Sequence, residues 1–394
     1  MKEKILIVHN YYQIPGGEDT VVVNEKKLLE DNGHKVILYS RNNSELKTMS
    51  TIQKLLLPFT TVFSLRTYRE VKQIIKEQHI GIVHIHNTLN LISPSVYYAA
   101  FSCKVPVVQT IHNFRMLCPG ATFYRDGHIC EDCVEHGLGC AVKHNCYRGS
   151  KLQTLMCVIT TKIHRMLGTY KKLNYICLTE FNKQKLLQLK QIKPEKVFVK
   201  PNFTFRADVK HQNGLFYLYI GRIEAIKGVD KILSAFSKMP DKQLKLAGTG
   251  TILDELKDEY QSLENVEFLG YVEHEDLIEL VAQTKALIID SQWYEPFGMI
   301  VIEAYASGVP VIAGDIENIS SLVTHNITGI KFKYDSIEEL IAAVDEFESS
   351  RQQWNQNVIK EYEEMYSPER NIVMLETIYQ DVAQPRVSVG GNRS

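Results

Sequence analysis

The chain of 394 residues is 44% hydrophobic and 23% charged, so it is long enough for two domains that each bury a core. A formal net charge of -1 excludes a general electrostatic attraction to nucleic acid, and we expect no nucleic-acid partner. Since no apolar stretch approaches about 18 residues and the N-terminus lacks the features of a signal peptide, we expect a cytoplasmic protein without a transmembrane helix.

Strand-length apolar runs alternate with helical patterns through the first half of the chain. Helical periodicity covers segments such as 21–29 and 68–77. The predicted strands are Ile5–Val8, Val36–Tyr39, Gly81–Ile85, Val105–Ile111, Tyr175–Leu178 and Val197–Val199. This alternation predicts a parallel sheet covered by helices on both faces, in an N-terminal domain of residues 1–200.

Proline and a polar run interrupt the pattern over residues 201–214, where we place the linker. Further strands are predicted at Leu215–Ile220, Leu244–Ala247, Val266–Leu269, Ala286–Ile289, Val309–Ala313 and Gly329–Phe332. We expect a second domain over 215–365, a C-terminal helix over 366–383 that packs back toward the N-terminal domain, and a disordered tail over 384–394. The sequence thus predicts an α/β protein of two doubly wound, Rossmann-like domains facing each other across a cleft, which is the default ligand site.

The segment from Glu295 to Pro310 is predicted to form a loop, a helix and the entry to a strand. Backbone N–H groups at the start of such a helix stabilise diphosphate oxygens without a cation, and here they belong to Phe297, Gly298, Met299 and Ile300. Glu295 and Glu303 are expected to accept hydrogen bonds from sugar or ribose hydroxyls. The alternative is that both glutamates merely cap or pair on a helix surface, which the apolar neighbours of Glu303 argue against.

Two cations follow the first predicted strand of the second domain, in the stretch from Gly221 to Gly228. Arg222 and Lys227 are expected to stabilise the negative charge that grows on a departing nucleotide diphosphate, although solvated charge is the commoner role of such residues. No Asp-x-Asp pair, which would hold a divalent cation, occurs in the sequence, so we expect metal-independent catalysis.

Glycines and histidines mark further strand ends. Gly16 and Gly17 follow the first strand, where the backbone could approach the diphosphate, and Gly250 is expected on a donor-side loop. His112 ends one predicted strand of the N-terminal domain, and His86 ends another, followed by Asn87. We place His86 and Asn87 on the side of the cleft that would bind the acceptor, the molecule to which a group is transferred from the nucleotide diphosphate. The alternatives are an ordinary turn for the glycines and a satisfied core histidine for each imidazole.

These motifs together resemble the retaining glycosyltransferases of family four over nearly the whole chain. The resemblance implies the GT-B fold, with the donor bound mainly by the second domain and the acceptor mainly by the first. It also implies that Glu295 and His112 contact the donor sugar and that Glu303 contacts the ribose. Gly221 belongs to the matching Gly-Arg…Lys-Gly signature of the donor site. Retention of the anomeric configuration is implied as well, with the leaving phosphate oxygen accepting the acceptor's proton.

We therefore expect a hexosyltransferase that moves a sugar from a UDP- or GDP-sugar to a glycan or polyprenyl-linked glycan. The resemblance places it in bacterial capsule, exopolysaccharide or cell-surface polysaccharide assembly, with no cofactor required for catalysis. Two alternatives stay open, a catalytically inactive nucleotide-binding scaffold and a sugar-nucleotide epimerase of the same fold.

Cysteines crowd a loop-rich insertion at about residues 118–146. One Cys-x-x-Cys pair with further thiols is the pattern of a structural zinc site, for which the candidate ligands are Cys118, Cys130, Cys133 and Cys146. The irregular spacing leaves reduced thiols as one alternative and a redox disulfide as another.

Basic and apolar residues interleave over 54–69 and 151–172. Basic amphipathic helices can lie on an anionic membrane, and a polyprenyl-linked acceptor would favour peripheral contact with the inner face of the cell membrane. Equally, their apolar stripes can pack on the domain core, which is the commoner outcome.

Overall fold

The computed structural model describes residues 3–13, 16–206, 212 and 214–383, which form two compact units. Unit 1 takes its residues from Met1–Pro119, His136–Lys200 and Asn371–Ser394, and unit 2 takes its residues from Gly120–Glu135 and Pro201–Arg370. Residues 120–135 therefore belong to unit 2, although we expected them within the N-terminal domain. The predicted tail over 384–394, and positions 207–211 and 213 of the predicted linker, lie outside the described residues.

Unit 1 is built on a six-stranded parallel sheet with the strand order β2-β1-β3-β4-β7-β8. Each strand predicted in the first half of the chain overlaps one of its members, which are β1 (Lys4–Tyr11), β2 (Lys35–Asn42), β3 (Ile82–Ile85), β4 (Val107–Ile111), β7 (Asn174–Cys177) and β8 (Val197–Val199). Every residue of β3 and β4 is buried, as expected for central strands covered on both faces.

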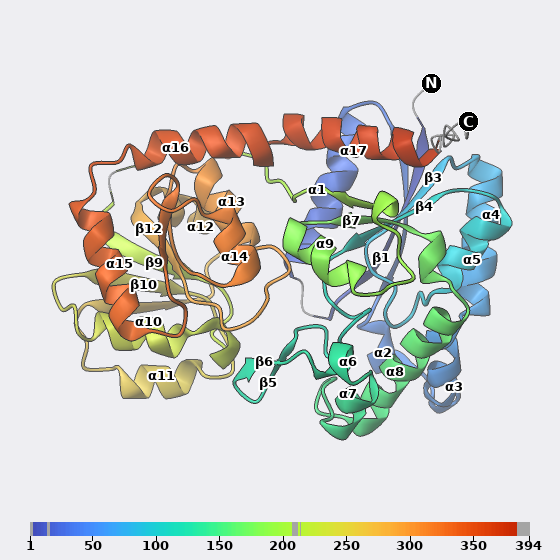
Figure 1. The fold of residues 1–394 in the computed structure, drawn as a ribbon, viewed down its shortest axis with the longest axis horizontal. Coiled ribbons are helices and arrows are strands. Elements are labelled where there is room, and N and C mark those ends of the chain that lie inside the picture. The colour runs from blue at the N-terminus through green and yellow to red at the C-terminus, as the bar shows by residue number, and fades with distance from the viewer. Residues whose placement is uncertain (1–2, 14–15, 207–211, 213, 384–394) are drawn as a thin grey trace, which may run out of the picture. The chain divides into compact units, whose positions relative to one another are not determined.

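Helices flank this sheet, and α4 and α5 pack against each other beside it (Figure 1). The helices are α1 (Gly17–Asp31), α2 (Glu45–Thr48), α3 (Thr51–Val62), α4 (Leu65–Gln78), α5 (Ser95–Ser102), α7 (Gly139–Lys143), α8 (Lys151–Met166) and α9 (Glu180–Leu187). The predicted C-terminal helix is α17 (Pro368–Ala383), and its residues from Asn371 onward belong to unit 1. The end of the chain therefore completes the unit that its beginning starts.

Unit 2 contains a second six-stranded parallel sheet, with the order β11-β10-β9-β12-β13-β14. Its strands also overlap the predicted ones and are β9 (Phe216–Ile220), β10 (Gln243–Ala247), β11 (Val266–Gly270), β12 (Thr284–Ile289), β13 (Val311–Gly314) and β14 (Gly329–Phe332). The order is that of a Rossmann-type sheet, in which the chain changes direction across the sheet between β9 and β12.

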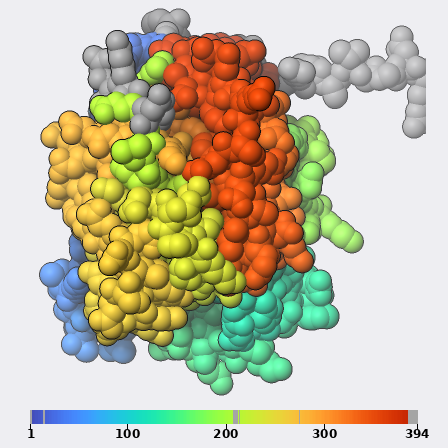
Figure 2. All heavy atoms as spheres, turned by 90° about the vertical axis from the view of Figure 1, so that its left-hand side faces the viewer, coloured from blue at the N-terminus to red at the C-terminus, as the bar shows by residue number. Residues whose placement is uncertain are grey.

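The helices of unit 2 are α10 (Val229–Phe236), α11 (Leu253–Glu259), α12 (His274–Ala282), α13 (Met299–Ala306), α14 (Glu317–Leu322), α15 (Ile337–Ser349) and α16 (Trp354–Glu361). α10 and α15 lie side by side over a core that includes Ile232, Leu233, Leu340 and Val344. Figure 2 shows their outer surface, where yellow-green residues of α10 adjoin red residues of α15. In the part of the chain that the structure describes, no helix combines the length and apolarity needed to cross a bilayer.

Residues 120–135 form a small hairpin and one helical turn on unit 2. The hairpin consists of β5 (Tyr124–Arg125) and β6 (His128–Ile129), and the turn is α6 (Asp132–Glu135). The Tyr294 hydroxyl donates a hydrogen bond to the Glu131 carboxylate over 3.3 Å, and the Phe123 ring meets the Tyr294 ring edge to face. These contacts explain why the segment belongs to unit 2.

Candidate functional site

The loops that follow β9 and β10 in unit 2 pack closely against each other. The Gly221 amide donates to the Ala247 carbonyl over 3.1 Å, and the Ile223 amide donates to the Thr249 carbonyl over 2.9 Å. A Cβ at Gly250 would lie 2.0 Å from the Ile223 carbonyl oxygen, so only glycine fits there. Gly250 therefore brings the two loops together, while Arg222 between them stays exposed.

The loops that follow β9 and β12 meet at the point where the strand order reverses. The Gln292 amide donates to the Ile226 carbonyl over 2.9 Å, which ties the loop of Lys227 to the loop of Glu295. Open α/β sheets bind ligands beyond the carboxyl ends of their strands at such a reversal. Lys227 and Glu295, both predicted from the sequence as site residues, therefore lie where this sheet is expected to bind a ligand.

Glu295 and Lys227 form an ion pair, a contact that the sequence interpretation did not include. Ser291 donates a further hydrogen bond to the Glu295 carboxylate over 2.6 Å, and the Lys227 ammonium lies 5.6 Å from the centre of the Trp293 ring. Burial opposes ionisation of Glu295, but the Lys227 charge and these hydrogen bonds hold its pKa below the ordinary value. The carboxylate is therefore ionised at neutral pH and can accept hydrogen bonds from hydroxyls.

Helix α13 begins at Met299, with Gly298 as its N-cap at φ 113°. A Cβ on Gly298 would lie 2.5 Å from the Ile319 side chain, and the backbone angle is strained for any other residue. The N–H groups of Met299 and Ile300 belong to the first turn, which has no acceptor within the helix. Glu303 follows on the same helix and is half-buried, and Phe297 packs its ring against Tyr366. The backbone N–H groups of Met299 and Ile300, which are predicted to bind the donor, therefore lie at the N-terminus of a helix.

Asp290, directly after β12, is an acidic group that the sequence interpretation missed. It is fully buried, and burial raises its pKa to about 7. The Asp335 amide donates to its Oδ1 atom over 3.3 Å. An acid that directly follows an apolar strand is the signal that could have identified it, since strand ends form the ligand edge of such sheets.

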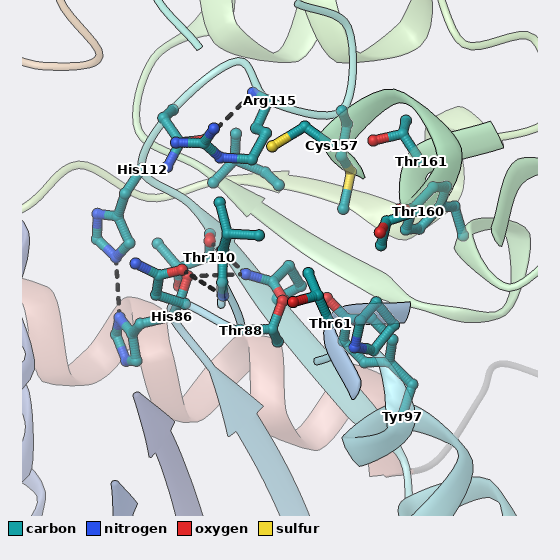
Figure 3. Close-up of a pocket in the computed structure, with 18 residues that line it drawn as sticks. Thr61, His86, Thr88, Tyr97, Thr110, His112, Arg115, Cys157, Thr160 and Thr161 are labelled. Atoms are coloured by element: carbon teal, nitrogen blue, oxygen red, sulfur yellow. Dashed lines mark hydrogen bonds between the residues drawn. The ribbon is translucent and has the colours of Figure 1, made fainter. Parts of the chain in front are cut away.

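In unit 1, His86 and His112 lie next to each other at the ends of β3 and β4. His86 Nδ1 and His112 Nε2 are 2.9 Å apart and the two rings stack (Figure 3). Burial, with the neighbouring His84, lowers the pKa of His86 to about 4, and burial with His86 lowers the pKa of His112 well below its usual range. Both imidazoles are therefore neutral at physiological pH.

Glu25 of α1 is a buried carboxylate next to these histidines that sequence analysis did not single out. Its Oε1 lies 2.9 Å from His84 Nδ1 and 3.3 Å from His86 Nε2, and its Oε2 lies 3.4 Å from Lys200 Nζ. Burial disfavours the carboxylate, but His84, Lys200 and His86 hold its pKa well below the ordinary value. The Tyr379 hydroxyl, from α17, also meets His84 Nδ1 over 2.7 Å.

The Glu25 carboxylate determines which ring nitrogens carry protons. A carboxylate only accepts hydrogen bonds, so the Nε2 of His86 that faces it is assigned the proton. His86 Nδ1 then accepts from His112 Nε2, which leaves His112 Nδ1 as a lone-pair acceptor. Neutral His112 can therefore accept a hydrogen bond from a ligand hydroxyl.

His112, His86 and Asn87 line a pocket within unit 1. Figure 3 shows threonine hydroxyls gathered around it, and these belong to Thr61, Thr88, Thr110, Thr160 and Thr161. Arg115, whose guanidinium stacks on Tyr147 at 4.9 Å, adds a positive charge to the wall. Hydroxyls, neutral imidazole and one guanidinium suit a polar, hydroxyl-rich ligand.

Gly16 and Gly17, which are predicted to approach a diphosphate, begin α1 with a turn that is capped by an acid. Gly16 is the N-cap, and its amide donates to the Asp19 carboxylate over 3.1 Å. The other Asp19 oxygen lies 2.7 Å from His9 Nε2. Glu18 beside them is half-buried, and burial of its carboxyl group raises its pKa to about 8. Carboxyl groups therefore lie at the start of α1, and the approach of Gly16 and Gly17 to a diphosphate stays a prediction.

A metal could be held by Glu25, His84 and His86, which form the one group of three or more His, Cys, Asp or Glu ligand atoms within 4.8 Å among the described residues. The Lys200 ammonium already supplies a positive charge to that carboxylate. The predicted zinc ligands are divided between the units, with Cys118 and Cys146 in unit 1 and Cys130 and Cys133 in unit 2. The zinc site stays a prediction.

Two family models match the chain. Residues 202–364 match the model described as "Glycosyl transferases group 1", and residues 15–128 match the model described as "Glycosyltransferase Family 4". The first segment contains the loops of Lys227 and Glu295, and the second contains Glu25 and the histidines.

Similar proteins include a glycogen synthase from Mycobacterium tuberculosis, 33% identical over 134 residues that cover 32% of each chain. The O-antigen biosynthesis glycosyltransferase WbnH of Escherichia coli is 24% identical over 229 residues, which cover 56% of this chain and 62% of that protein. The chain thus spans about a third to three fifths of these relatives. The crystal structure of Anabaena Alr3699/HepE in complex with UDP-glucose has a TM-score of 0.64, with 17% identity over 96% of this chain and all of that one. Both units together have the GT-B fold.

Proposed function

We propose that this chain, which has the GT-B fold and matches glycosyltransferase family models over two segments, is a retaining hexosyltransferase. It takes a UDP- or GDP-sugar as donor and a glycan or polyprenyl-linked glycan as acceptor, in capsule, exopolysaccharide or cell-surface polysaccharide assembly. The observation that carries the proposal is the Lys227–Glu295 pair beside the N-terminus of α13, at the strand-order reversal of unit 2. The UDP-glucose complex of the Anabaena neighbour supports the donor class.

In this mechanism the diphosphate lies against the first turn of α13, and Lys227 and Arg222 stabilise the charge on the leaving phosphate. Glu295 and Glu303 accept hydrogen bonds from donor hydroxyls. The absence of an Asp-x-Asp pair supports catalysis without a metal ion. On the acceptor side, the pocket at His112, His86 and Asn87 holds hydroxyl groups of the acceptor, while direct contact of His112 with the donor sugar stays a prediction of the family resemblance.

Thermal unfolding with UDP, GDP and UDP-glucose tests donor binding. A nucleotide that binds only the folded chain at about 100 times its Kd stabilises it by about 2.7 kcal/mol, which raises the melting temperature. Lys227→Met should lose most of that increase. Lys360→Met is the matched control, because this lysine on α16 is 74% exposed and its substitution should leave the increase intact. If none of the three nucleotides raises the melting temperature, the donor assignment is wrong.

Turnover distinguishes the alternatives. A transferase releases the nucleotide diphosphate when a membrane or glycan extract supplies the acceptor, and EDTA should leave that rate unchanged. NMR of the product's anomeric proton then tests retention. An epimerase would convert the sugar while it remains attached to the nucleotide, and an inactive scaffold would bind the nucleotide with neither change.

A further inference from the structure

Helix α3 turns its apolar side toward solvent. Ile52, Leu55, Leu56 and Phe59 are 70%, 70%, 51% and 73% exposed, and their spacing places them on one face of the helix. Thr61 is the one residue of α3 that is classed as buried. A helix of a water-soluble protein normally packs such a stripe on its own core, so this arrangement requires another explanation.

Helix α8 continues this exposed apolar face. Leu152, Leu155, Ile159 and Met166 are 67%, 39%, 37% and 86% exposed. α3 and α8 pack against each other, as Figure 1 shows, and His164 Nε2 of α8 lies 3.0 Å from the carbonyl oxygen at the end of α3. We call these eight side chains the apolar surface: Ile52, Leu55, Leu56, Phe59, Leu152, Leu155, Ile159 and Met166.

In the chain segments that carry the apolar surface, every charged side chain is a lysine or an arginine. Residues 46–69 and 139–174 together contain eleven lysines and arginines and no aspartate or glutamate, although the whole chain has a net charge of -1. One of the eleven, Arg66, pairs with Glu70 just outside the first segment. Lys54 and Lys151, on α3 and α8 themselves, are exposed. An exposed apolar stripe with cations around it is complementary to an anionic lipid surface, where both kinds of group are stabilised.

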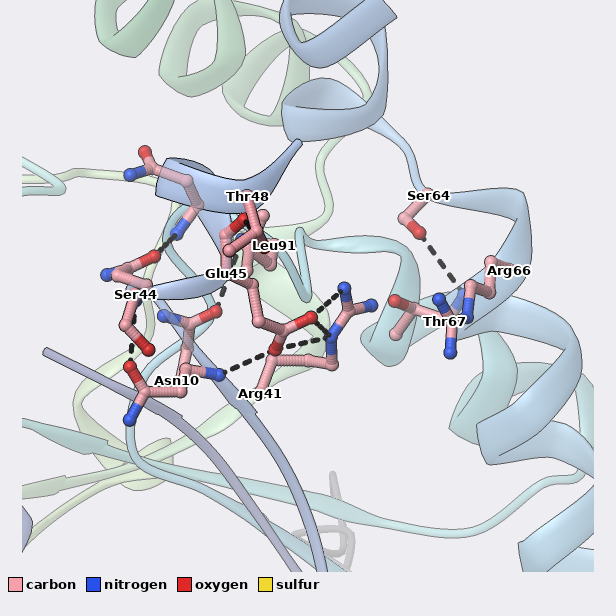
Figure 4. Close-up of polar contacts among 12 residues, drawn as sticks. Asn10, Arg41, Ser44, Glu45, Thr48, Ser64, Arg66, Thr67 and Leu91 are labelled. Carbon is pink, nitrogen blue, oxygen red and sulfur yellow. Dashed lines mark hydrogen bonds and ion pairs between the residues drawn. The ribbon is translucent and has the colours of Figure 1, made fainter. Parts of the chain in front are cut away.

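Polar contacts on both sides of α3 hold the helix in place without a partner. Before it, the Arg41 guanidinium pairs with the Glu45 carboxylate of α2 over 2.7 Å (Figure 4). After it, Ser64 accepts a hydrogen bond from the Thr67 amide over 3.2 Å and so caps α4. The Ser50 side chain caps α3 itself by accepting from the Gln53 amide. The exposed stripe is therefore part of a formed helix, with little ordering left to occur on binding.

The same two helices form one wall of the unit 1 pocket. Thr61 of α3, and Cys157, Thr160 and Thr161 of α8, line the pocket (Figure 3). The side chains of the apolar surface are exposed to solvent on the same two helices. A surface that bound lipid would hold the hydroxyl-lined pocket close to the lipid headgroups.

We infer that the apolar surface docks the protein on an anionic lipid bilayer, so that the pocket behind α3 and α8 receives the glycan end of a lipid-linked acceptor. The choice of acceptor rests on the proposed function, whereas the docking does not. A second copy of the chain fits less well, because a symmetric contact would bring the same positively charged segments face to face. Docking also differs from spanning, since the side chains would reach only the headgroup and upper acyl region.

Co-flotation with lipid vesicles tests the docking. We expect the full chain to float with vesicles of phosphatidylcholine and phosphatidylglycerol, and to float much less with phosphatidylcholine alone or in high salt. Leu55→Gln with Phe59→Gln should lower the partition coefficient about tenfold or more, because two exposed apolar side chains no longer enter the lipid. Lys54→Glu with Lys151→Glu should lower binding to the anionic vesicles and leave the weak binding to neutral vesicles unchanged.

The control is Val23→Gln, which changes an apolar side chain of α1 that is 56% exposed and should leave flotation unchanged. All five altered positions are exposed, and circular dichroism with the melting temperature verifies that each variant is folded. If the wild type does not float with anionic vesicles, or if the α3 variant floats as well as the wild type, the inference is wrong. A shift from dimer to monomer in the α3 variant, without flotation of the wild type, would identify a self-association surface instead.

The outcome is separate from that of the proposed function. Flotation without any nucleotide-dependent rise in melting temperature would retain the docking and reject the transferase. A nucleotide-dependent rise without flotation would retain the donor site and reject the docking.

Discussion

The two units place charged pairs in contrasting surroundings. In unit 1, the side chains of Glu25 and Lys200 are only 1% and 2% exposed, and histidines surround the carboxylate. In unit 2, the side chains of Glu295 and Lys227 are 13% and 17% exposed, on loops that follow two strands. A ligand can exchange contacts with the second pair but cannot reach the first. The pKa of Glu25 is held well below the ordinary value and that of Glu295 is lowered, and we propose a positioning role for the first carboxylate and ligand binding for the second.

The largest effect is expected from Glu25→Gln, which removes the carboxylate and leaves the Lys200 ammonium buried without its counter-charge. Breaking a buried pair in this way costs about 3–5 kcal/mol of unfolding free energy. Urea denaturation, followed by circular dichroism, measures the change.

The companion variant is Glu25→Gln with Lys200→Met, which removes both charges and should recover most of the lost stability. A loss below about 1 kcal/mol in Glu25→Gln alone would show that the buried pair does not support unit 1.

Glu295→Gln should affect activity and spare stability. Loss of one preorganised group that contacts the donor typically lowers kcat about 10²–10³-fold. We expect a decrease of that size in nucleotide release, with a change of about 1 kcal/mol or less in unfolding free energy, because Ser291 and Lys227 can still meet the amide oxygen. Glu364→Gln, at a side chain that is 61% exposed, serves as the control. Equal turnover in both variants would contradict the proposed mechanism.

The smallest effect, when it is counted per pH unit, concerns Asp290 and the pH dependence of stability. Its folded-state pKa of about 7 lies above the ordinary aspartate value of 3.8, so the folded chain binds the proton more tightly than the unfolded chain. Stability from this group is complete below pH 3.8 and decreases toward pH 7, by at most about 1.4 kcal/mol per pH unit.

Asp290→Asn should remove this dependence of unfolding free energy on pH. Urea denaturation between roughly pH 5 and 8 should therefore give a flatter plot of unfolding free energy against pH than that of the wild type. Asp254→Asn, at an exposed position of α11, should leave the profile unchanged. An unaltered slope in Asp290→Asn would mean that another group titrates there.

Much of the fold of both units could be predicted from the sequence, because strand-length apolar runs bounded by glycine and proline specify buried parallel strands. The helix after Glu295 was also predictable, because Glu295 to Glu303 is one continuous segment, while its role in donor binding stays a prediction. The exact start of α13 was not, because the backbone at Gly298 has φ 113° only in the packed structure.

The centre of unit 1 could not be predicted in the same way. Glu25 lies within a helical pattern in which an acid is usually solvated, and Lys200 is 175 positions farther along the chain. Only the sheet and α17 bring them beside His84. Likewise, the spacing of Leu55 and Phe59 defines one face of a helix but does not show whether that face meets the core or solvent.

The return of the last helix to unit 1 determines the order in which the chain can finish folding during synthesis. Asn371 accepts a hydrogen bond from Lys200 over 2.9 Å, and Tyr379 contacts His84, so unit 1 lacks two buried partners until residues 371–379 have been synthesised. The main segment of unit 2, Pro201–Arg370, is complete before then. The buried charges of unit 1 therefore depend on a segment that is synthesised only after the main segment of unit 2.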